Sequence, residues 1–184
     1  VKNSQGLLYV NKSTNNVTVK NVNVENCYYG ARIITVNNAN FENVNISGTK
    51  YGIEIQNQAN RNVTFKNCEI AAETPVYVNP KGTGTITFYF KEINDLGIEE
   101  LNFGEYAKVV ADAMVGTKIY EKFDAALAAD GTVKVINPIV ITENKEYDFT
   151  YETIVGEVYP IIRVQGDATL TIKNNGIFKG YVVT

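Results

Sequence analysis

Few residues of this chain could carry out chemistry. The chain has no histidine, and no aspartate occurs before residue 90. Arg32 and Glu54 are the pair best placed for catalysis, because they occupy matching positions in the similar segments 29–33 and 51–55. Matching positions on neighbouring strands also produce ordinary surface ion pairs, worth about 0–1 kcal/mol. We favour the ion pair and assign no catalytic residue.

Metal and thiol chemistry have little support. Asp95, Glu99 and Glu100 lack the alternating spacing of oxygen ligands in a calcium loop, so we expect solvated charges there. Cys68 falls in a column of apolar residues and Cys27 falls in a different column, which predicts two free thiols. We therefore expect no metal site and no cofactor.

Tyrosine is the residue type that most suggests ligand binding. The chain contains 12 tyrosines and no tryptophan. If matching repeats stack, Tyr28, Tyr29, Tyr51 and Tyr77 could line one lateral face, where aromatic rings could stack against sugars. Tyrosine is also common as a half-buried strand residue. A glycan-facing surface and a structural role both stay open.

A repeat in the first half of the chain must position these residues. Segments 17–24, 39–46 and 63–70 align without gaps at a period of 22 to 24 residues. Within each segment, apolar and polar residues alternate as they do in a strand with one buried face. A leucine-rich repeat has a similar period but needs a helical half with regularly spaced leucines, and that pattern is absent. The sequence therefore predicts an all-β fold, a parallel β-helix with coils of about 22–24 residues.

Asparagine and glycine mark fixed positions in the repeat. Of the 23 asparagines, 17 precede residue 80. The alternation changes phase at Asn21, Asn43 and Asn67, and asparagine tolerates left-handed backbone angles. We expect a corner at each of them, with the amides stacked in a hydrogen-bonded ladder. A second set of equivalent turn or ladder positions is Gly6, Gly30 and Gly52.

The run 16–24, with Tyr51–Ile55 half a coil after the matching segment 39–46, resembles the right-handed β-helices of the pectate-lyase-like superfamily. This resemblance covers residues 1–90 and implies the fold, whereas the functions of the superfamily range from lyases, hydrolases and esterases to adhesins, phage tailspikes and inert stalks. Its hydrolases use clustered aspartates with a Gly-His-Gly motif, its lyases use calcium-binding acids with an arginine base, and its esterases use two aspartates. None of these sets is present, so we expect a chain that is not an enzyme.

The second half of the chain follows another pattern. Residues 85–90 predict one more strand. In the acidic stretch that follows, 106–115 could be a weakly capped helix or, as we prefer, part of a pair of strands around Gly116. Residues 120–129 predict a short amphipathic helix that ends before Gly131. Further strands are predicted at 132–136, 138–142, 147–149, 161–164 and 168–172.

This order resembles β-helix modules of large bacterial surface proteins and some phage fibres, on the runs 116–120, 123–127, 130–135 and 168–177. The resemblance implies a helix that caps the open end of a solenoid, because an open coil exposes apolar core and unpaired strand edges. We therefore expect β-helix coils in 1–90, a connector in 91–117, and a cap with the opening coils of a second segment in 118–184.

Charge, hydropathy and the chain ends indicate what the chain could bind and in what context it occurs. A net charge of −3 without a basic stripe argues against nucleic acid, and no apolar run reaches the roughly 20 residues of a membrane helix. The chain begins and ends in mid-pattern, so we expect an excerpt of a multi-module protein or a subunit that stacks head to tail.

We predict a non-enzymatic structural module of an extracellular filament, cell-surface protein or virion fibre. Its expected partners are copies of itself or adjacent modules that stack end to end. One alternative is an adhesin module that binds glycans or a host surface. A second alternative is a fragment of a polysaccharide lyase or hydrolase.

Overall fold

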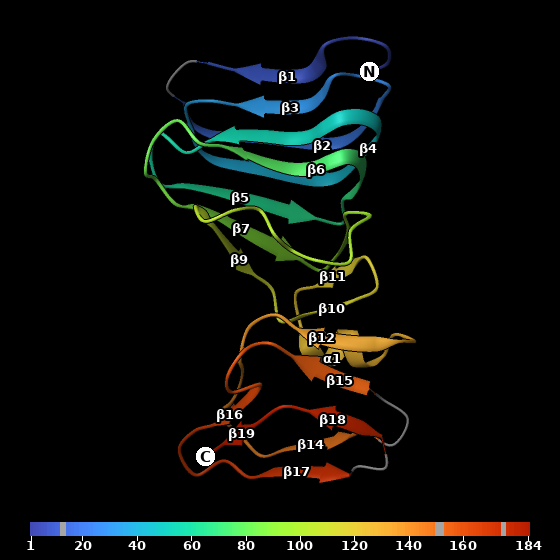
Figure 1. Ribbon diagram of the computed structural model, residues 1–184, viewed down its shortest axis with the longest axis vertical. Coiled ribbons are helices and arrows are strands. Elements are labelled where there is room, and N and C mark those ends of the chain that lie inside the picture. The colour runs from blue at the N-terminus through green and yellow to red at the C-terminus, as the bar shows by residue number, and fades with distance from the viewer. Residues whose placement is uncertain (12–13, 150–152, 174–175) are drawn as a thin grey trace. The chain divides into compact units, whose positions relative to one another are not determined.

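A computed structural model describes residues 1–11, 14–149, 153–173 and 176–184 and divides into two compact units (Figure 1). Unit 1 comprises Val1–Val110 with Thr117–Ile119, and unit 2 comprises Ala111–Gly116 with Tyr120–Thr184. Unit 1 therefore extends past residue 90, where we expected the first coils to end.

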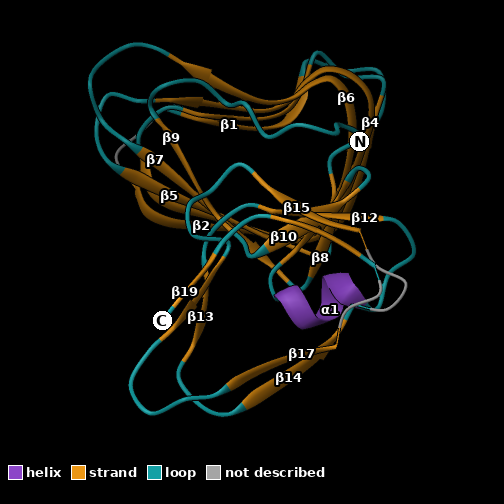
Figure 2. Ribbon diagram, turned by 60° about the horizontal axis from the view of Figure 1, so that its bottom comes forward, coloured by secondary structure: helices purple, strands orange, loops and turns teal. Residues whose placement is uncertain are grey.

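Unit 1 is a parallel β-helix, as predicted. Its longest strands, β2 (Thr14–Glu25), β4 (Val36–Gln56) and β6 (Glu69–Asn79), follow the corners of successive coils and pair in parallel, β2 with β4 and β4 with β6. Two further ladders run β1–β3–β4 and β4–β5–β7–β9. Figure 2 shows these strands lying over one another from coil to coil. The shorter strands are β1 (Gly6–Val10), β3 (Tyr29–Ile33), β5 (Arg61–Lys66), β7 (Ile86–Lys91), β8 (Ile93–Asp95) and β9 (Ala107–Val110).

The predicted apolar columns form the core of unit 1. Val19, Phe41 and Phe65 lie opposite one another in the ladder, and Phe41 and Phe65 are 1% and 0% exposed. Their rings stack with centroids 5.7 Å apart. Because each inward position recurs at the same place in the next coil, the core continues from coil to coil.

The predicted glycines occupy strands, not turns, because Gly6, Gly30 and Gly52 lie in β1, β3 and β4. The predicted match of Gly30 with Gly52 is correct, since they lie between the opposite pairs Tyr29–Tyr51 and Ala31–Ile53. The match of Gly6 with Gly30 was wrong by one residue, because Gly6 is opposite Tyr29. A Cβ on Gly30 would collide with the carbonyl oxygen of Gly52 and the side chain of Ile46. Glycine is required here because the neighbouring chain approaches too closely for any side chain.

The segment between residues 91 and 117 contains strands. β9 lies parallel to β7, so coils continue after residue 90, and β8 places Asp95 opposite Glu69 of β6. Residues 106–115 form strands, β9 and β10 (Ala113–Val115), in preference to the alternative helix. Gly116 has a φ of 55°, and β11 (Lys118–Tyr120) follows it.

Unit 2 consists of short parallel strands in three ladders, β12–β15–β18, β13–β16–β19 and β14–β17. β10 pairs with β12 in the antiparallel direction. The predicted strands correspond to β12, β13, β14, β16 and β17, whereas β15, β18 and β19 were missed. Residues 174–175 of the run 168–177 lie outside the described residues. The strands are β12 (Thr132–Val135), β13 (Ile139–Ile141), β14 (Lys145–Asp148), β15 (Thr153–Gly156), β16 (Ile162–Val164), β17 (Leu170–Lys173), β18 (Ile177–Lys179) and β19 (Val182–Val183).

The predicted short helix is present as α1 (Phe123–Leu127), purple in Figure 2. It begins at Phe123 because Lys122 has extended angles, with φ −119° and ψ 137°. Phe123 and Ala126 are buried in the core of unit 2, where Phe123 meets Tyr147 edge-on at 5.4 Å and Phe149 lies 5.8 Å from Phe178. This aromatic cluster is the centre of the unit 2 core.

Candidate functional site

Outward side chains of β1, β3, β4 and β6 gather on one surface of unit 1. Tyr29 lies opposite Tyr51 in one column. In the next column, four residues face one another across successive strands, and they are Tyr9, Arg32, Glu54 and Tyr77. We call this the tyrosine surface, made of Tyr9, Tyr28, Tyr29, Arg32, Lys50, Tyr51, Glu54 and Tyr77.

The four tyrosines that the sequence placed on one lateral face are in mutual contact. The ring of Tyr51 stacks with Tyr29 at 5.7 Å and with Tyr77 at 5.1 Å. Tyr28 meets Tyr29 edge-on at 4.6 Å and Tyr51 at 5.8 Å. Stacking of this kind directs ring faces toward neighbouring coils. The rings of Tyr29 and Tyr51 therefore serve contacts within the protein.

A buried carboxylate lies among these rings. Glu54 is 2% exposed, and Arg32 Nε lies 3.2 Å from Glu54 Oε2. Asn79 Nδ2 donates to Glu54 Oε1 at 2.8 Å. Burial raises the pKa of Tyr29, and the charge of Glu54 raises this pKa further. Arg32 and Glu54 form the predicted ion pair, but the carboxylate is far more buried than a surface pair.

Two cations of this surface lie over tyrosine rings. The guanidinium of Arg32 lies 5.6 Å from the ring centroid of Tyr9 and 5.4 Å from that of Tyr29. Lys50 Nζ lies 5.3 Å from Tyr28 and also 5.3 Å from Tyr51. A hydrogen bond with Tyr28 raises the pKa of Lys50. Such cation–π contacts are attractive because each cation lies over the negative face of an aromatic ring.

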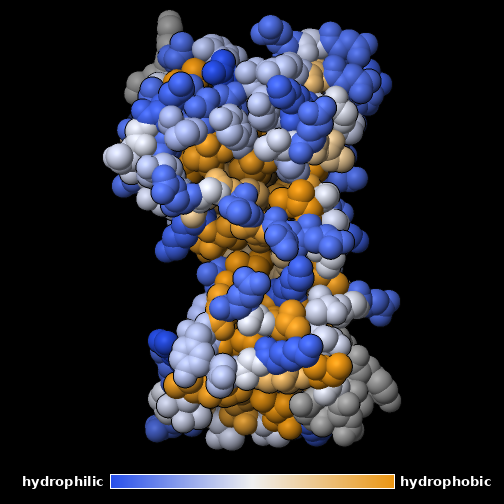
Figure 3. Space-filling view, viewed as in Figure 1, coloured by the Kyte–Doolittle hydropathy of each residue, from blue (hydrophilic) through white to orange (hydrophobic). Residues whose placement is uncertain are grey.

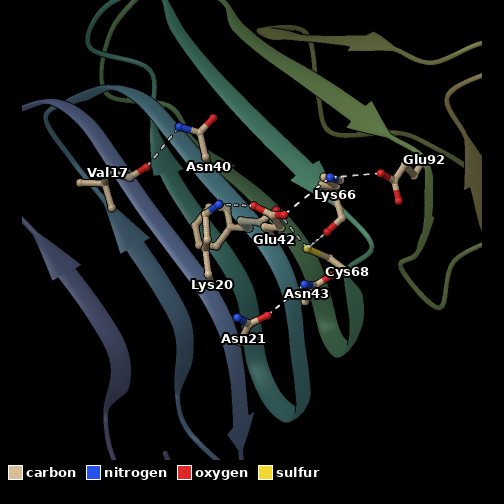
Figure 4. A network of polar contacts seen from close by, with 10 residues as sticks. Val17, Lys20, Asn21, Asn40, Glu42, Asn43, Lys66, Cys68 and Glu92 are labelled. Atoms are coloured by element: carbon tan, nitrogen blue, oxygen red, sulfur yellow. Dashed lines mark hydrogen bonds and ion pairs between the residues drawn. The ribbon is translucent and has the colours of Figure 1, made fainter.

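A second surface of unit 1 carries charges that alternate along the stack (Figure 4). Glu42 lies between Lys20 and Lys66, and Lys66 lies between Glu42 at 3.6 Å and Glu92 at 3.1 Å. The hydrogen bond from Lys20 holds the pKa of Glu42 below its usual value. The hydrogen bond to Glu92 raises the pKa of Lys66. We call these four residues the charge ladder, which was not predicted although Lys20, Glu42 and Lys66 align in the repeat.

The three corner asparagines adopt left-handed backbone angles. Their φ values are 54° at Asn21, 52° at Asn43 and 52° at Asn67. Asn43 Nδ2 donates to Asn21 Oδ1 at 2.9 Å, which forms one rung of the expected ladder (Figure 4).

A longer amide ladder was missed. It joins Asn62 to Asn38 and Asn38 to Asn16, with each bond at 2.9 Å, and Asn37 donates to Asn15 at 3.1 Å beside it. The match of residues 38 and 62 with 16 in the alignment was the signal that could have revealed it. In each rung the later coil donates to the earlier one.

Both cysteines are free, as predicted, and both are buried. Cys68 Sγ donates to the Phe41 carbonyl oxygen at 3.3 Å, and burial raises the pKa of the Cys68 thiol. A raised pKa keeps the thiol protonated, so Cys68 is a poor nucleophile at neutral pH. Within the described residues, no group of three or more His, Cys, Asp or Glu could hold a metal ion.

Two surface hollows occur among the described residues. One in unit 2, of about 440 Å³, is lined by Asp112, the start of α1, and β13 and β14. Asp112 Oδ2 accepts the N–H of Phe123 at 3.0 Å, and burial raises the pKa of this carboxyl. Asp124 pairs with Lys145 there. The other hollow, of about 430 Å³ in unit 1, lies beside Asn45, Cys68 and Lys118.

The parallel coils and the ladders between them define the class of the protein. The family described as right handed beta helix region matches residues 5–104, more than half of the chain. The chain belongs to this family. Comparisons with curated proteins and with solved structures found no match. Among the described residues, no helix is both long and apolar enough to cross a membrane.

Proposed function

We propose that this chain is a non-enzymatic structural module, a stiff β-helix segment of an extracellular filament, cell-surface protein or virion fibre. It stacks end to end with copies of itself or with adjacent modules. The observation that carries this proposal is that polar and aromatic side chains of unit 1 are engaged with their own counterparts in the next coil.

The charged residues that a catalytic site would use are paired with residues on neighbouring coils. Glu42, Lys66 and Arg32 all pair with charges on neighbouring coils. Glu54 pairs with Arg32 and accepts a hydrogen bond from Asn79. Pairing of this kind favours rigidity over chemistry, because a catalytic group must be free to reach a substrate. A non-enzymatic role follows most simply.

The ends of the ladders support stacking. Among the described residues, β1 pairs only with β3, and β17 pairs only with β14. In the last coil of unit 2, Ile177, Tyr181 and Val182 are 52%, 64% and 39% exposed. Figure 3 shows apolar surface on one face of unit 2. Unpaired strand edges with apolar side chains favour pairing with a further coil.

Electron microscopy of the purified chain tests this proposal. Stacked copies would give fibres with an axial repeat of one subunit, and sedimentation would show mass rising with concentration. Monodisperse monomers at high concentration would contradict stacking. A panel of polysaccharides incubated with the chain tests the second half of the proposal, since any cleavage would contradict a non-enzymatic role.

Glycan binding is the second candidate, and two rings favour it. Tyr9 and Tyr28 are 59% and 45% exposed, so each offers aromatic surface to solvent. Binding of an oligosaccharide on a glycan array, lost in Tyr28→Ala and kept in Tyr159→Ala, would support this candidate. Tyr159 is a suitable control because it is 71% exposed and belongs to unit 2. No binding at millimolar sugar would contradict it.

A further inference from the structure

The open edge of β2 has a defined chemistry. We infer that this edge accepts a parallel strand from an adjacent β-helix module, and that the strand carries a carboxylate opposite Lys20 and amide or carbonyl oxygens opposite Asn15 and Asn16. This inference rests on the proposed stacking function and names the partner that one edge fits.

The edge is incompletely covered. β2 pairs with β4 on one side, and among the described residues nothing pairs with Asn15–Val22 on the other. Val17, Val19 and Val22 are only half-buried. The residues opposite two of them in the next coil, Ala39 and Phe41, are each 1% exposed. A strand laid on this edge would bury the same columns in the first coil, and burial of their apolar surface stabilises the pairing.

The register of the incoming strand is fixed by the neighbouring backbone. Lys2 lies parallel and opposite Glu25. The N–H of Glu25 donates to Val1 O at 2.8 Å, and the N–H of Asn3 donates to Glu25 O at 3.1 Å. The last residues of β2 thus already carry a parallel neighbour on this edge. A strand that continues this ladder places its side chains directly over those of β2.

The charge ladder determines which charge the strand needs. Lys66 has a carboxylate on each side, Glu42 and Glu92, and Glu42 has a lysine on each side. Lys20 has Glu42 on one side, and its other side faces the open edge (Figure 4). An acidic residue opposite Lys20 would continue the alternation along the charge ladder. A lysine at that position would repel Lys20.

The amide ladder has a direction that determines the second requirement. Asn38 donates to Asn16 and Asn37 donates to Asn15, so each earlier coil supplies the oxygen. If Asn15 and Asn16 follow the same direction, their side-chain N–H groups are donors on the open edge of β2. An incoming strand satisfies them with asparagine side chains at these two positions.

The last coil of a second copy fits this edge poorly. Strands β17, β18 and β19 contain Lys173 and Lys179 and no acidic residue. The coil from Val36 carries Glu42, Asn37 and Asn38 at the required spacing. The edge therefore favours a module with coils like those of unit 1 over the C-terminal coil of a copy.

An extension of the chain tests the inference. A copy of residues 36–45 placed before Val1 brings the copied Glu42 opposite Lys20, because Lys2 lies opposite Glu25. Three versions are compared: the native copy, a copy with Glu42→Gln, and a copy with Glu42→Lys. A scrambled ten-residue extension is the control. The measurement is the midpoint of thermal unfolding of unit 1, at low salt and at 1 M salt.

We expect the native copy to melt above the Gln copy and the Lys copy to melt lowest, with about 2–4 °C between the extremes at low salt. The difference should shrink at 1 M salt, where the Debye length is about 3 Å. Equal gains from all three copies would overturn the charge requirement and leave stacking intact. A scrambled extension that stabilises as much as the native copy would overturn both.

Discussion

Units 1 and 2 are both built from parallel coils, yet different interactions hold them together. In unit 1 the strands are long, as in β2 and β4, and side-chain ladders connect one coil to the next. In unit 2 the strands contain two to four residues, and the core centres on the aromatic residues Phe123, Tyr147 and Phe149. Stability in unit 1 is thus distributed over repeats, whereas in unit 2 it is concentrated in one cluster.

Removal of one ring should have the largest effect, and it should affect the two units differently. Phe149 is 0% exposed and contacts the rings of Phe123, Tyr147 and Phe178. We expect Phe149→Ala to lower the free energy of unfolding of unit 2 by about 3–5 kcal/mol. Hydrogen exchange followed by mass spectrometry should then show faster exchange throughout β12–β18, with unit 1 unchanged.

Phe65→Ala is the matched variant in unit 1. Phe65 is also 0% exposed and stacks with Phe41 and Phe90 at 5.7 and 5.3 Å. Because coils contact mainly their neighbours, faster exchange should be limited to β4, β5 and β7 and should spare β1. Loss of protection throughout unit 1 would show that its stability is not distributed over repeats.

The buried ion pair of the tyrosine surface should give the next largest effect. Glu54→Gln leaves Arg32 beside a neutral amide and gives Asn79 an uncharged acceptor. We expect a loss of about 1.5–3 kcal/mol, the range for a hydrogen bond to a charged group. Urea unfolding of the chain measures this loss. The double variant Arg32→Met with Glu54→Leu should recover part of it, because replacement of both partners removes the unpaired charge. An unchanged midpoint in Glu54→Gln would mean that the pair contributes nothing.

The sequence predicted unit 1 better than unit 2 for a physical reason. In unit 1 the same inward position recurs in each coil, so Val19, Phe41 and Phe65 could be aligned by their spacing along the chain alone. The break in the period after residue 80 hid the continuation past β7 into β9, although β7 itself was predicted as one more strand. In unit 2 the core depends on contacts such as Phe149 with Phe178, which no period connects. Short strands such as β19 carry too few residues for alternation to be visible.

The candidate site was predicted only in part. The repeat brought Tyr29 and Tyr51 together, since they match in sequence, but the stacking of their rings depends on side-chain angles that a pattern does not contain. Burial of Glu54 likewise depends on how neighbouring rings pack. The wrong alignment of Gly6 with Gly30 came from treating residues 5–9 as a copy of residues 29–33, whereas the strands pair one residue out of that alignment.

The amide ladder should contribute a smaller amount, confined to unit 1. Asn38 accepts from Asn62 and donates to Asn16. Its amide also donates to the Asn15 carbonyl oxygen at a longer distance of 3.4 Å. We expect Asn38→Ala to cost about 1–2 kcal/mol, mainly from the two shorter bonds, which are exposed and worth about 0.5–1.5 kcal/mol each. Asn45→Ala is the control, because Asn45 is exposed on the same strand, β4, and its side chain makes no hydrogen bond in the described structure. Equal losses in the two variants would show that strand propensity, not the ladder, sets the cost.

The two units should respond to acid in opposite directions, with the smallest effects. Burial raises the pKa of Asp112 in unit 2. As the pH falls, the folded unit therefore binds a proton at Asp112 before the unfolded chain does. The stability of unit 2 consequently rises as the pH falls through that raised pKa toward 3.8. The hydrogen bond from Lys20 lowers the pKa of Glu42 in unit 1, so the stability that this residue contributes is present above pH 4.5 and is lost as the pH falls through the lowered pKa.

Two amide variants separate these contributions. Asp112→Asn keeps an oxygen for the N–H of Phe123, so it should flatten the acid stabilisation of unit 2 without removing the hydrogen bond. Glu42→Gln should reduce the loss of unit 1 stability in acid. It should also make that stability less dependent on salt, since Lys20 and Lys66 lose the carboxylate with which both of them pair. Backbone NMR signals of each unit, followed through denaturant unfolding between pH 7 and 3, give both curves in one sample. Parallel curves for the two units would mean that burial of Asp112 and pairing of Glu42 do not govern their response to pH.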